Sequence, residues 1–223
     1  MNSAIIVAAG SGTRFGSKIP KQFLEIGGKP LLIHALEKFD NCSIIDEIIL
    51  ILLVDEIGNF KLTLEKFNIE KLKQIVIGGT TRAESVRNGL NAIDAKKCEI
   101  VAVHDGARPL VSVEEITQTI DKAREIGAAC LVAKVTDTIK EVSDGKIERT
   151  IDRENLRRAL TPQAFRFEIL QRAFAPENFD SKATDECFLV EKLGYKIAFV
   201  DGSAKNIKIT TREDFLTAQS FLK

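Results

Sequence analysis

Short apolar runs alternate along the chain with longer amphipathic stretches. The first run, Ala-Ile-Ile-Val-Ala at 4–8, is rich in β-branched residues and typical of a buried strand of a parallel sheet. From similar runs we expect strands at 4–8, within 46–54, and at 74–77, 100–104, 129–135, 196–200 and 206–209. Apolar residues spaced three or four apart predict helices at 30–39, 55–72 (with a break), after Gly79, and at 112–127, 167–174, 184–194 and from 211. Strands separated by helices indicate an α/β fold.

Residues 138–151 depart from this pattern. Apolar and polar residues alternate there around Ser-Asp-Gly-Lys at 143–146, and Asp-Gly is a strong hairpin signal. A hairpin inserted between parallel strands should project from the body, and projecting arms commonly bind a partner subunit. We therefore expect one domain over 1–223, with a Rossmann-like three-layer, mostly parallel sheet and a projecting β-hairpin arm for dimerisation at about 136–156.

Three helices carry recognisable start signals. Ser112 is followed three residues later by Glu115, and Thr211 by Asp214, which is the spacing of a capping box. Thr184 is the expected N-cap of the helix that ends near 194.

Composition and charge exclude several classes of protein. The chain has 32 basic and 32 acidic residues, so its net charge is zero, and a protein whose main partner is nucleic acid would show a basic excess. No apolar run approaches the ~20 residues that span a membrane. The four cysteines form no C-x-x-C pair and have no histidine array near them, which argues against zinc and a disulfide framework. With no leader ahead of the first strand, we expect a cytoplasmic protein.

The segment 7–16, Val-Ala-Ala-Gly-Ser-Gly-Thr-Arg-Phe-Gly, follows the first strand and consists mainly of small residues. Successive backbone N–H groups in such a loop form a concave anion site, to which Arg14 and Lys21 add full charges. The dinucleotide fingerprint and the P-loop would both need glycine at position 15, where Phe15 stands. The pattern A-A-G-x-G-x-R followed by P-K-Q fits without a gap and resembles the signature loop of nucleotidyltransferases. An ordinary strand-to-helix turn would have no packing reason for Arg14 and Lys21.

Two further strand ends carry candidate chemistry. Gly78-Gly79 leads into a helix whose first turn contains Arg82 and Ser85, which suits an anion or a base edge. A plain loop with a solvated arginine explains that segment equally well. The strand at 100–104 ends in Asp-Gly-Ala-Arg-Pro, at the edge where ligands bind in open α/β sheets. A carboxylate there can hold a divalent cation, and an arginine can hold phosphate.

The remaining histidines and arginines have plainer explanations. His104 ends its strand and His34 lies within a helix, and both are interpreted as structural. A basic cluster on or just after the arm is, on composition alone, a solvated charged face; it comprises Arg149, Arg153, Arg157 and Arg158.

Together and in order, these segments resemble one family over essentially the whole chain, the 2-C-methyl-D-erythritol 4-phosphate cytidylyltransferases. The residues that carry the resemblance are 8–14, 20–22, 78–86, 103–109, 137–138, 152–153, 160–163, 184–186 and 206–210. The resemblance implies that the 4-phosphate of the polyol attacks the α-phosphate of CTP and that pyrophosphate leaves. Since the attacking phosphate is already an anion, no general base is required; catalysis must bring two polyanions together and stabilise the extra charge.

The resemblance also assigns residues to roles. Arg14 and Lys21 would be catalytic, at the α-phosphate. The nucleotide-binding residues would be Ala8, Ala9, Gly10, Ser11, Gly12 and Thr13 around the triphosphate, with Gly79, Arg82, Ser85, Asp105 and Gly106 around cytosine and ribose. The polyol phosphate would meet Arg108, Thr138, Arg153, Thr161, Thr184 and Lys208. Thr138 and Arg153 are expected from the arm of a second subunit, so that a homodimer shares its sites. Mg²⁺ is the implied cofactor, and Asp105 is the candidate metal ligand.

Three alternatives stay open at this stage. A ribitol-5-phosphate cytidylyltransferase has a similar loop and fold, although those enzymes tend to carry serine-valine before the arginine at 108. A dinucleotide-dependent oxidoreductase fits the fold pattern but not the glycine spacing. A nucleotide-binding regulator without turnover would have no need for charges at the reacting phosphorus.

Overall fold

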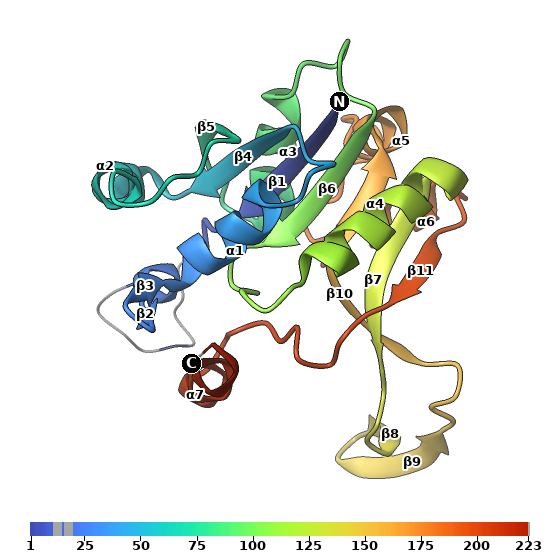
Figure 1. The fold of residues 1–223 in the computed structure, drawn as a ribbon. Helices are drawn as coiled ribbons and strands as arrows, with labels where there is room; N and C mark the ends of the chain where they lie inside the picture. The colour runs from blue at the N-terminus through green and yellow to red at the C-terminus, as the bar shows by residue number, and fades with distance from the viewer. Residues whose placement is uncertain (11–14, 16–19, 223) are drawn as a thin grey trace.

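A seven-stranded sheet forms the centre of the computed structural model, which describes residues 1–10, 15 and 20–222 (Figure 1). The strand order is β11-β7-β10-β6-β1-β4-β5. The strands are β1 (Asn2–Val7), β4 (Glu47–Leu52), β5 (Leu72–Ile77), β6 (Ile100–Asp105), β7 (Ala128–Lys134), β10 (Arg157–Arg166) and β11 (Ala198–Asp201). Only β10 runs antiparallel to its neighbours, β6 and β7. The predicted mostly parallel α/β sheet is thus confirmed.

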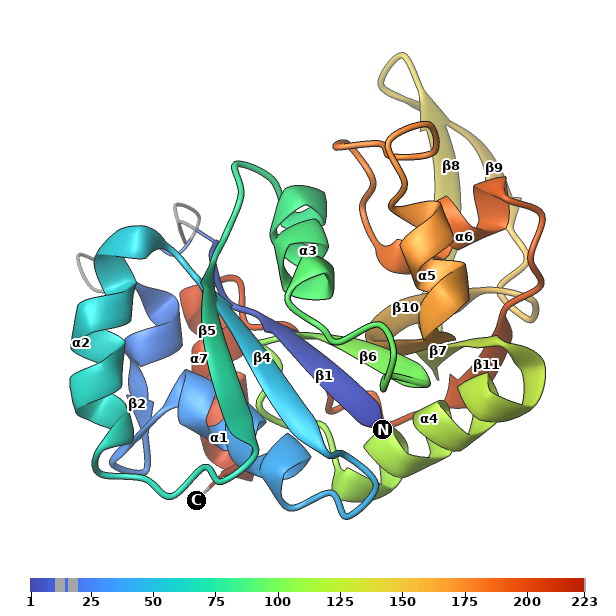
Figure 2. The same cartoon turned by 90° about the horizontal axis from the view of Figure 1, so that it is seen from above.

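Helices cover both faces of this sheet and give three layers, as Figure 2 shows from above. One core cluster joins the sheet to α1 (Leu31–Asp40), α2 (Val54–Leu64) and α4 (Val113–Ile126). A second cluster, on the opposite face, joins it to α3 (Arg82–Asn91), α5 (Phe167–Ala173) and α6 (Glu186–Lys192). Strands β1, β4 and β6 are continuous apolar runs because both of their faces are covered.

Small elements complete the body next to α1. They are η2 (Lys21–Phe23), β2 (Glu25–Ile26), β3 (Lys29–Pro30) and α7 (Arg212–Phe221). Ile26, Leu31 and Ala218 share a third apolar cluster, through which α7 packs beside the start of α1. None of the helices in the described ranges combines the length and the apolarity needed to cross a membrane.

The arm is a two-stranded hairpin of β8 (Ile139–Ser143) and β9 (Lys146–Ile151). Asp144 and Gly145 both have positive φ, 48° and 74°, as the tight turn between twisted strands requires. The hairpin lies away from the sheet (Figure 1), and Val142 and Ile147 are 66% and 65% exposed. The predicted projecting hairpin is confirmed within the expected range 136–156.

Several local predictions hold and others are wrong. Ser112 and Thr211 form the predicted capping boxes. Thr184 is not an N-cap: the next residue, Asp185, accepts the N–H of Phe188 and caps α6. The predicted helix at 55–72 ends at 64, before β5 begins at 72.

The largest differences concern the C-terminal third. Residues 206–209 are not a strand; the N–H of Ile209 instead bonds to the carbonyl of Ala107, which ties this segment to the loop after β6. Strand β10 was not expected, because Pro162 interrupts it and polar residues dominate its ends. Its pairing with β7 shifts register between Ala159 and Gln163, and this irregularity accommodates the proline.

Candidate functional site

Three chain segments approach closely at the carboxyl ends of β1, β5 and β6. The N–H of Gly106 donates to the carbonyl of Val7 at 2.9 Å. A methyl group on Gly78 would lie 2.3 Å from the Cβ of Ala9, and one on Gly106 would lie 3.1 Å from the Cβ of Ala8. Glycine therefore lets the ends of the three strands pack together, at the sheet edge where open α/β folds bind ligands.

The carboxylate of Asp105, the last residue of β6, lies at the centre of a cluster of cations. Arg82 Nε donates to its Oδ1 at 3.0 Å. Arg108 Nε and Lys208 Nζ approach its Oδ2 at 3.3 and 3.0 Å. Burial on its own raises the pKa of Asp105, but these three cations outweigh burial and hold the pKa far below its ordinary value. Asp105 is therefore ionised at any physiological pH. We call these residues, with Glu186, the Asp105 cluster.

Arg82 also makes a two-pronged ion pair with Glu186, the first residue of α6. Its two terminal nitrogens lie 2.5 and 3.2 Å from the two carboxylate oxygens. Burial raises the pKa of Glu186, and Arg82 opposes that rise. Arg82 thus bridges both carboxylates of the Asp105 cluster. Because three cations face two carboxylates, the cluster has one surplus positive charge and suits an anionic ligand.

A hydrogen-bonded chain connects β10 to the loop after β6. The N–H of Asp105 donates to Thr161 Oγ1 at 3.1 Å, and Thr161 Oγ1 lies 2.9 Å from His104 Nδ1. On its other side, His104 Nε2 lies 3.0 Å from the carbonyl of Arg108. Since a carbonyl only accepts, Nε2 carries the proton and Thr161 donates to Nδ1. Burial lowers the pKa of His104 to about 4, so the ring is neutral, as expected for a structural histidine.

Gln163 positions α6 against this chain. Its Oε1 accepts the N–H groups of Glu186 and Cys187 at 3.1 and 3.0 Å, and its Nε2 donates to Asp185 at 2.9 Å. The amide therefore satisfies two backbone donors at the start of the helix. Glu186 and Gln163 lie in segments that carry the family resemblance, but the sequence alone indicates no role for their side chains. Only the packing of α6 against β10 reveals one.

The structure brings together five of the residues predicted from the sequence: Arg82, Asp105, Arg108, Thr161 and Lys208. Ser85 has a different task, because its Oγ accepts the N–H of Gly79 and donates to the carbonyl of Thr81, bracing the turn before α3. Ala8 and Ala9 adjoin the glycines described above. Thr184 is exposed just before α6.

The other predicted residues lie apart or outside the described ranges. Thr138 and Arg153 lie at the base of the arm, both exposed, where Arg153 donates to the carbonyl of Thr136. Ser11, Gly12, Thr13 and Arg14 are outside the described residues, and of Lys21 only the backbone, in η2, is described. Roles at these positions stay predictions.

The side chains around Asp105 decide whether its carboxylate could bind a metal ion directly. A carboxylate is the donor type that Mg²⁺ prefers. Both oxygens of Asp105, however, face cations, which repel a divalent metal. In the part of the chain that the structure describes, no group of three acidic, histidine or cysteine side chains could hold a metal. Direct metal binding by Asp105 therefore does not fit this arrangement.

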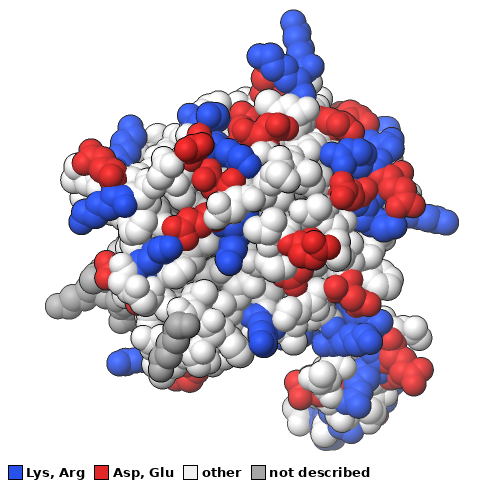
Figure 3. Space-filling model, viewed as in Figure 1, with Lys and Arg blue, Asp and Glu red and all other residues white. Residues whose placement is uncertain are grey.

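Charge on the molecular surface is otherwise mixed. On the face shown in Figure 3, acidic and basic side chains are interspersed over the body and over the arm. This distribution agrees with the zero net charge of the chain. The surplus positive charge of the Asp105 cluster is accordingly a local feature of the site.

Known proteins resemble the chain over its whole length. The family model described as IspD, 2-C-methyl-D-erythritol 4-phosphate cytidylyltransferase, matches residues 2–223. Proteins of that name from Syntrophus aciditrophicus and Syntrophotalea carbinolica are each 43% identical, over 99% and 98% of this chain and 95% and 94% of theirs. The crystal structure of a 4-diphosphocytidyl-2C-methyl-D-erythritol synthase from Anaerococcus prevotii superposes with a TM-score of 0.87. It is 34% identical, and the match covers 99% of this chain and 95% of that one.

Proposed function

The chain belongs to the 2-C-methyl-D-erythritol 4-phosphate cytidylyltransferase family, and we propose that its two substrates meet at the Asp105 cluster. The enzyme joins CTP to 2-C-methyl-D-erythritol 4-phosphate and releases pyrophosphate, a step of the non-mevalonate route to isoprenoids. Whole-chain identity to enzymes of that name favours this substrate over ribitol 5-phosphate.

We infer the location of the site from one observation, the surplus positive charge of the cations that surround Asp105. Arg108 and Lys208 approach the same carboxylate oxygen, so a phosphate that displaces their contacts finds two cations already side by side. We assign these two residues to the phosphate of the polyol. Thr161 supports them indirectly, because its one hydroxyl proton goes to His104 and its oxygen accepts the N–H of Asp105. This arrangement binds the nucleophile in its ionised form, as direct displacement at phosphorus requires.

The nucleotide would occupy the neighbouring strand ends. The backbone at 8–13 is assigned to the triphosphate, and Gly79, Arg82, Asp105 and Gly106 to cytosine and ribose. Ser85 would act indirectly, by bracing the turn that carries Gly79. The close approach of Gly78 to Ala9 supports this placement, because it joins the two loops in one surface. Arg14 and Lys21 would stabilise the charge that develops at the α-phosphate, where a preorganised cation acts most strongly.

Mg²⁺ would enter this site with CTP. Because the cations around Asp105 oppose a direct contact, we propose that triphosphate oxygens and water hold the ion, since Mg²⁺ keeps several waters and binds substrate phosphates. Its chemistry there is to offset triphosphate charge. We also place the enzyme in the cytoplasm, where the free thiols of its four cysteines remain reduced.

The arm supports a homodimer with shared sites. Val142 and Ile147 expose apolar surface on a hairpin that has little core of its own. If a partner subunit covers these two residues, Thr138 and Arg153 of this arm would lie at the Asp105 cluster of that partner. The double variant Val142→Asp/Ile147→Asp should therefore convert the dimer into a monomer, measured by light scattering, and reduce turnover with it. A variant that stays dimeric, or a fully active monomer, would contradict the shared site.

Pyrophosphate release from CTP tests the whole assignment. We expect release with 2-C-methyl-D-erythritol 4-phosphate and Mg²⁺, very little with ribitol 5-phosphate, and loss of release when a chelator removes the metal. Equal rates with the two polyol phosphates would refute the substrate. Undiminished turnover in the chelator would refute the cofactor.

A further inference from the structure

A buried amide meets a buried carboxylate on the α2 side of the site. Gln22, in η2, is 2% exposed, and Glu56, in the first turn of α2, is 8% exposed. The Nε2 of Gln22 donates to the carbonyl of Ala8 at 2.8 Å and lies 3.1 Å from the nearer carboxylate oxygen of Glu56. Since an amide nitrogen carries two hydrogens, both bonds form together. Gln22 therefore joins the end of β1 to α2.

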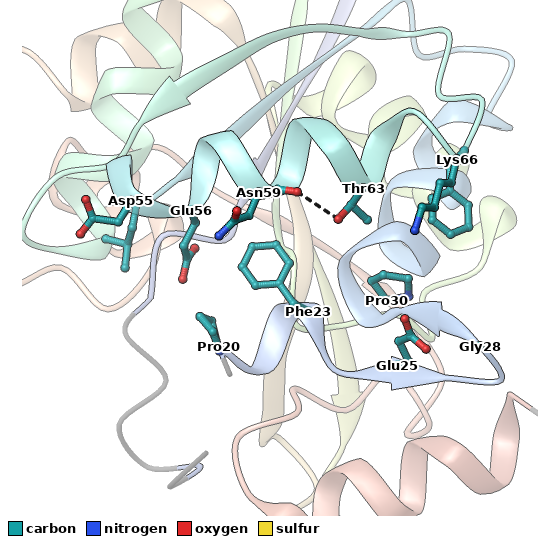
Figure 4. Close-up of a pocket in the computed structure, with 12 residues that line it drawn as sticks. Pro20, Phe23, Glu25, Gly28, Pro30, Asp55, Glu56, Asn59, Thr63 and Lys66 are labelled. Atoms are coloured by element: carbon teal, nitrogen blue, oxygen red, sulfur yellow. Dashed lines mark hydrogen bonds between the residues drawn. The ribbon is translucent and has the colours of Figure 1, made fainter. Parts of the chain in front are cut away.

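The next residue of η2 contacts the same face of α2. The ring of Phe23 lies 5.6 Å from the ring of Phe60, which is fully buried. Phe60 follows Glu56 by four residues, so both point to one side of the helix. In Figure 4, Glu56 and Phe23 face each other beneath α2, with Pro20 alongside. Two consecutive side chains thus hold η2, whose first residue is Lys21, against α2.

Stability alone does not account for a carboxylate at position 56. Burial raises the pKa of Glu56, which means that its ionised form is disfavoured there. It borders a cavity of about 760 Å³, shared with the charged residues Asp55, Glu25 and Lys66 and with Phe23. A buried charge is a weak source of stability compared with an apolar side chain of similar size. Its contact with Gln22 supplies a different reason for its presence.

We propose that Gln22 and Glu56 are positioning residues that place Lys21 for cytidylyl transfer. The inference rests on the role proposed above for Lys21 at the reacting phosphate. Lys21 precedes Gln22 directly, so any displacement of Gln22 moves the backbone of Lys21. The same amide nitrogen lies 3.4 Å from the carbonyl of Gly10, at the start of the glycine-rich loop. One amide, held by one carboxylate, thus sets the spacing between that loop and the turn that bears the lysine.

Single variants give the first test. Gln22→Met keeps the length of the side chain but removes both donors, and it should lower kcat about 10- to 100-fold, as a misplacement of about 1 Å does. The KM for CTP should change less than about threefold, since Lys21 is proposed to act mainly in the transition state. Glu56→Leu should lower kcat in the same way. Glu56→Gln, which keeps an acceptor oxygen, should retain most of the activity; equal losses in the two Glu56 variants would overturn the proposal.

Asp55 provides a matched control. It lies beside Glu56 in the same turn of α2 and lines the same cavity, but it is exposed. Asp55→Asn removes one negative charge from that turn and leaves the contact between Gln22 and Glu56 intact. Its kcat should equal that of the unaltered enzyme. A loss as large as that of Glu56→Leu would show that charge in this turn, rather than the contact, governs turnover.

A double-mutant cycle separates positioning from a general structural role. If Gln22 acts through Lys21, Gln22→Met should cost nothing further in a Lys21→Ala background. The same fold-loss in both backgrounds would overturn the positioning proposal, even if each variant were well folded by circular dichroism. Full activity of Lys21→Ala alone would refute the proposed role of Lys21. The two failures are therefore distinguishable.

Discussion

Replacing Asp105 by asparagine should destabilise the folded enzyme. The substitution keeps the shape of the side chain but removes the carboxylate that faces Arg82, Arg108 and Lys208 and leaves only Glu186, which contacts Arg82. The surplus of the Asp105 cluster therefore rises from one positive charge to two. Breaking a buried ion pair from one side costs about 3–5 kcal/mol. Lys208 is 36% exposed and adds little, so the lower half of that range is expected. For a chain of this size, about 3 kcal/mol lowers the Tm by about 10 °C.

The pH dependence of this difference follows from the pKa of Asp105. Its folded pKa lies below the unfolded value of about 4, so its contribution is fully present above pH 4 and is lost as the pH falls further. His104, the neighbouring titratable ring, has a pKa of about 4 and stays neutral above that pH. The raised pKa of Glu186, which shares Arg82 with Asp105, adds a second titration above the ordinary range of a carboxyl. The difference between the two proteins should therefore be constant from pH 8 to pH 7 and should shrink below pH 4.

Urea unfolding followed by circular dichroism measures this difference directly. The control is Asp121→Asn, since Asp121 pairs with Arg124 at 2.6 Å but is 56% exposed. An exposed pair contributes less than about 1 kcal/mol, so the control should unfold almost like the unaltered protein. If Asp105→Asn and Asp121→Asn cost the same, or if the cost of Asp105→Asn changes between pH 8 and pH 7, the electrostatic reasoning is refuted.

Substitutions at three further positions probe the rest of the site. Gly78→Ala places a methyl group 2.3 Å from the Cβ of Ala9, so it should lower the free energy of unfolding by about 1–3 kcal/mol and weaken CTP binding; an unchanged urea midpoint would contradict it. Thr161→Val removes the acceptor of a buried N–H and should cost about 1–3 kcal/mol, while Thr161→Ser should recover most of that loss. Arg153→Ala should raise the KM for the polyol phosphate about tenfold, the effect of one charged hydrogen bond, and should leave the KM for CTP unchanged. An equal rise in both KM values would count against the assignment of Arg153 to the polyol.

Much of the fold could be predicted from periodicity because the central strands are apolar on both faces. The same signal fails for β10, where Pro162 and flanking arginines hide a strand that sits between β6 and β7. Propensity describes a residue's local preference, whereas β10 owes its place to the two strands that it joins.

The residues of the site also divide into those that the local sequence predicts and those that only tertiary packing reveals. Asp105 and Arg108 could be placed at one sheet edge because parallel strands end together. The contact of Glu186 with Arg82 spans 104 residues of sequence, and that of Glu56 with Gln22 spans 34. Such contacts depend on how helices pack against loops, which no local spacing contains.

The arm leaves the body between β7 and β10, two adjacent strands, and β10 carries Thr161 a few residues beyond the point where the arm returns. Any molecule that binds the hairpin is therefore connected to the centre of the enzyme by a short segment of chain. A movement of the hairpin would displace first the irregular stretch of β10. Through the hydroxyl of Thr161 it would then displace the backbone of Asp105. In this fold, the hairpin that a second molecule would bind is followed directly along the chain by β10, the strand whose Thr161 contacts Asp105.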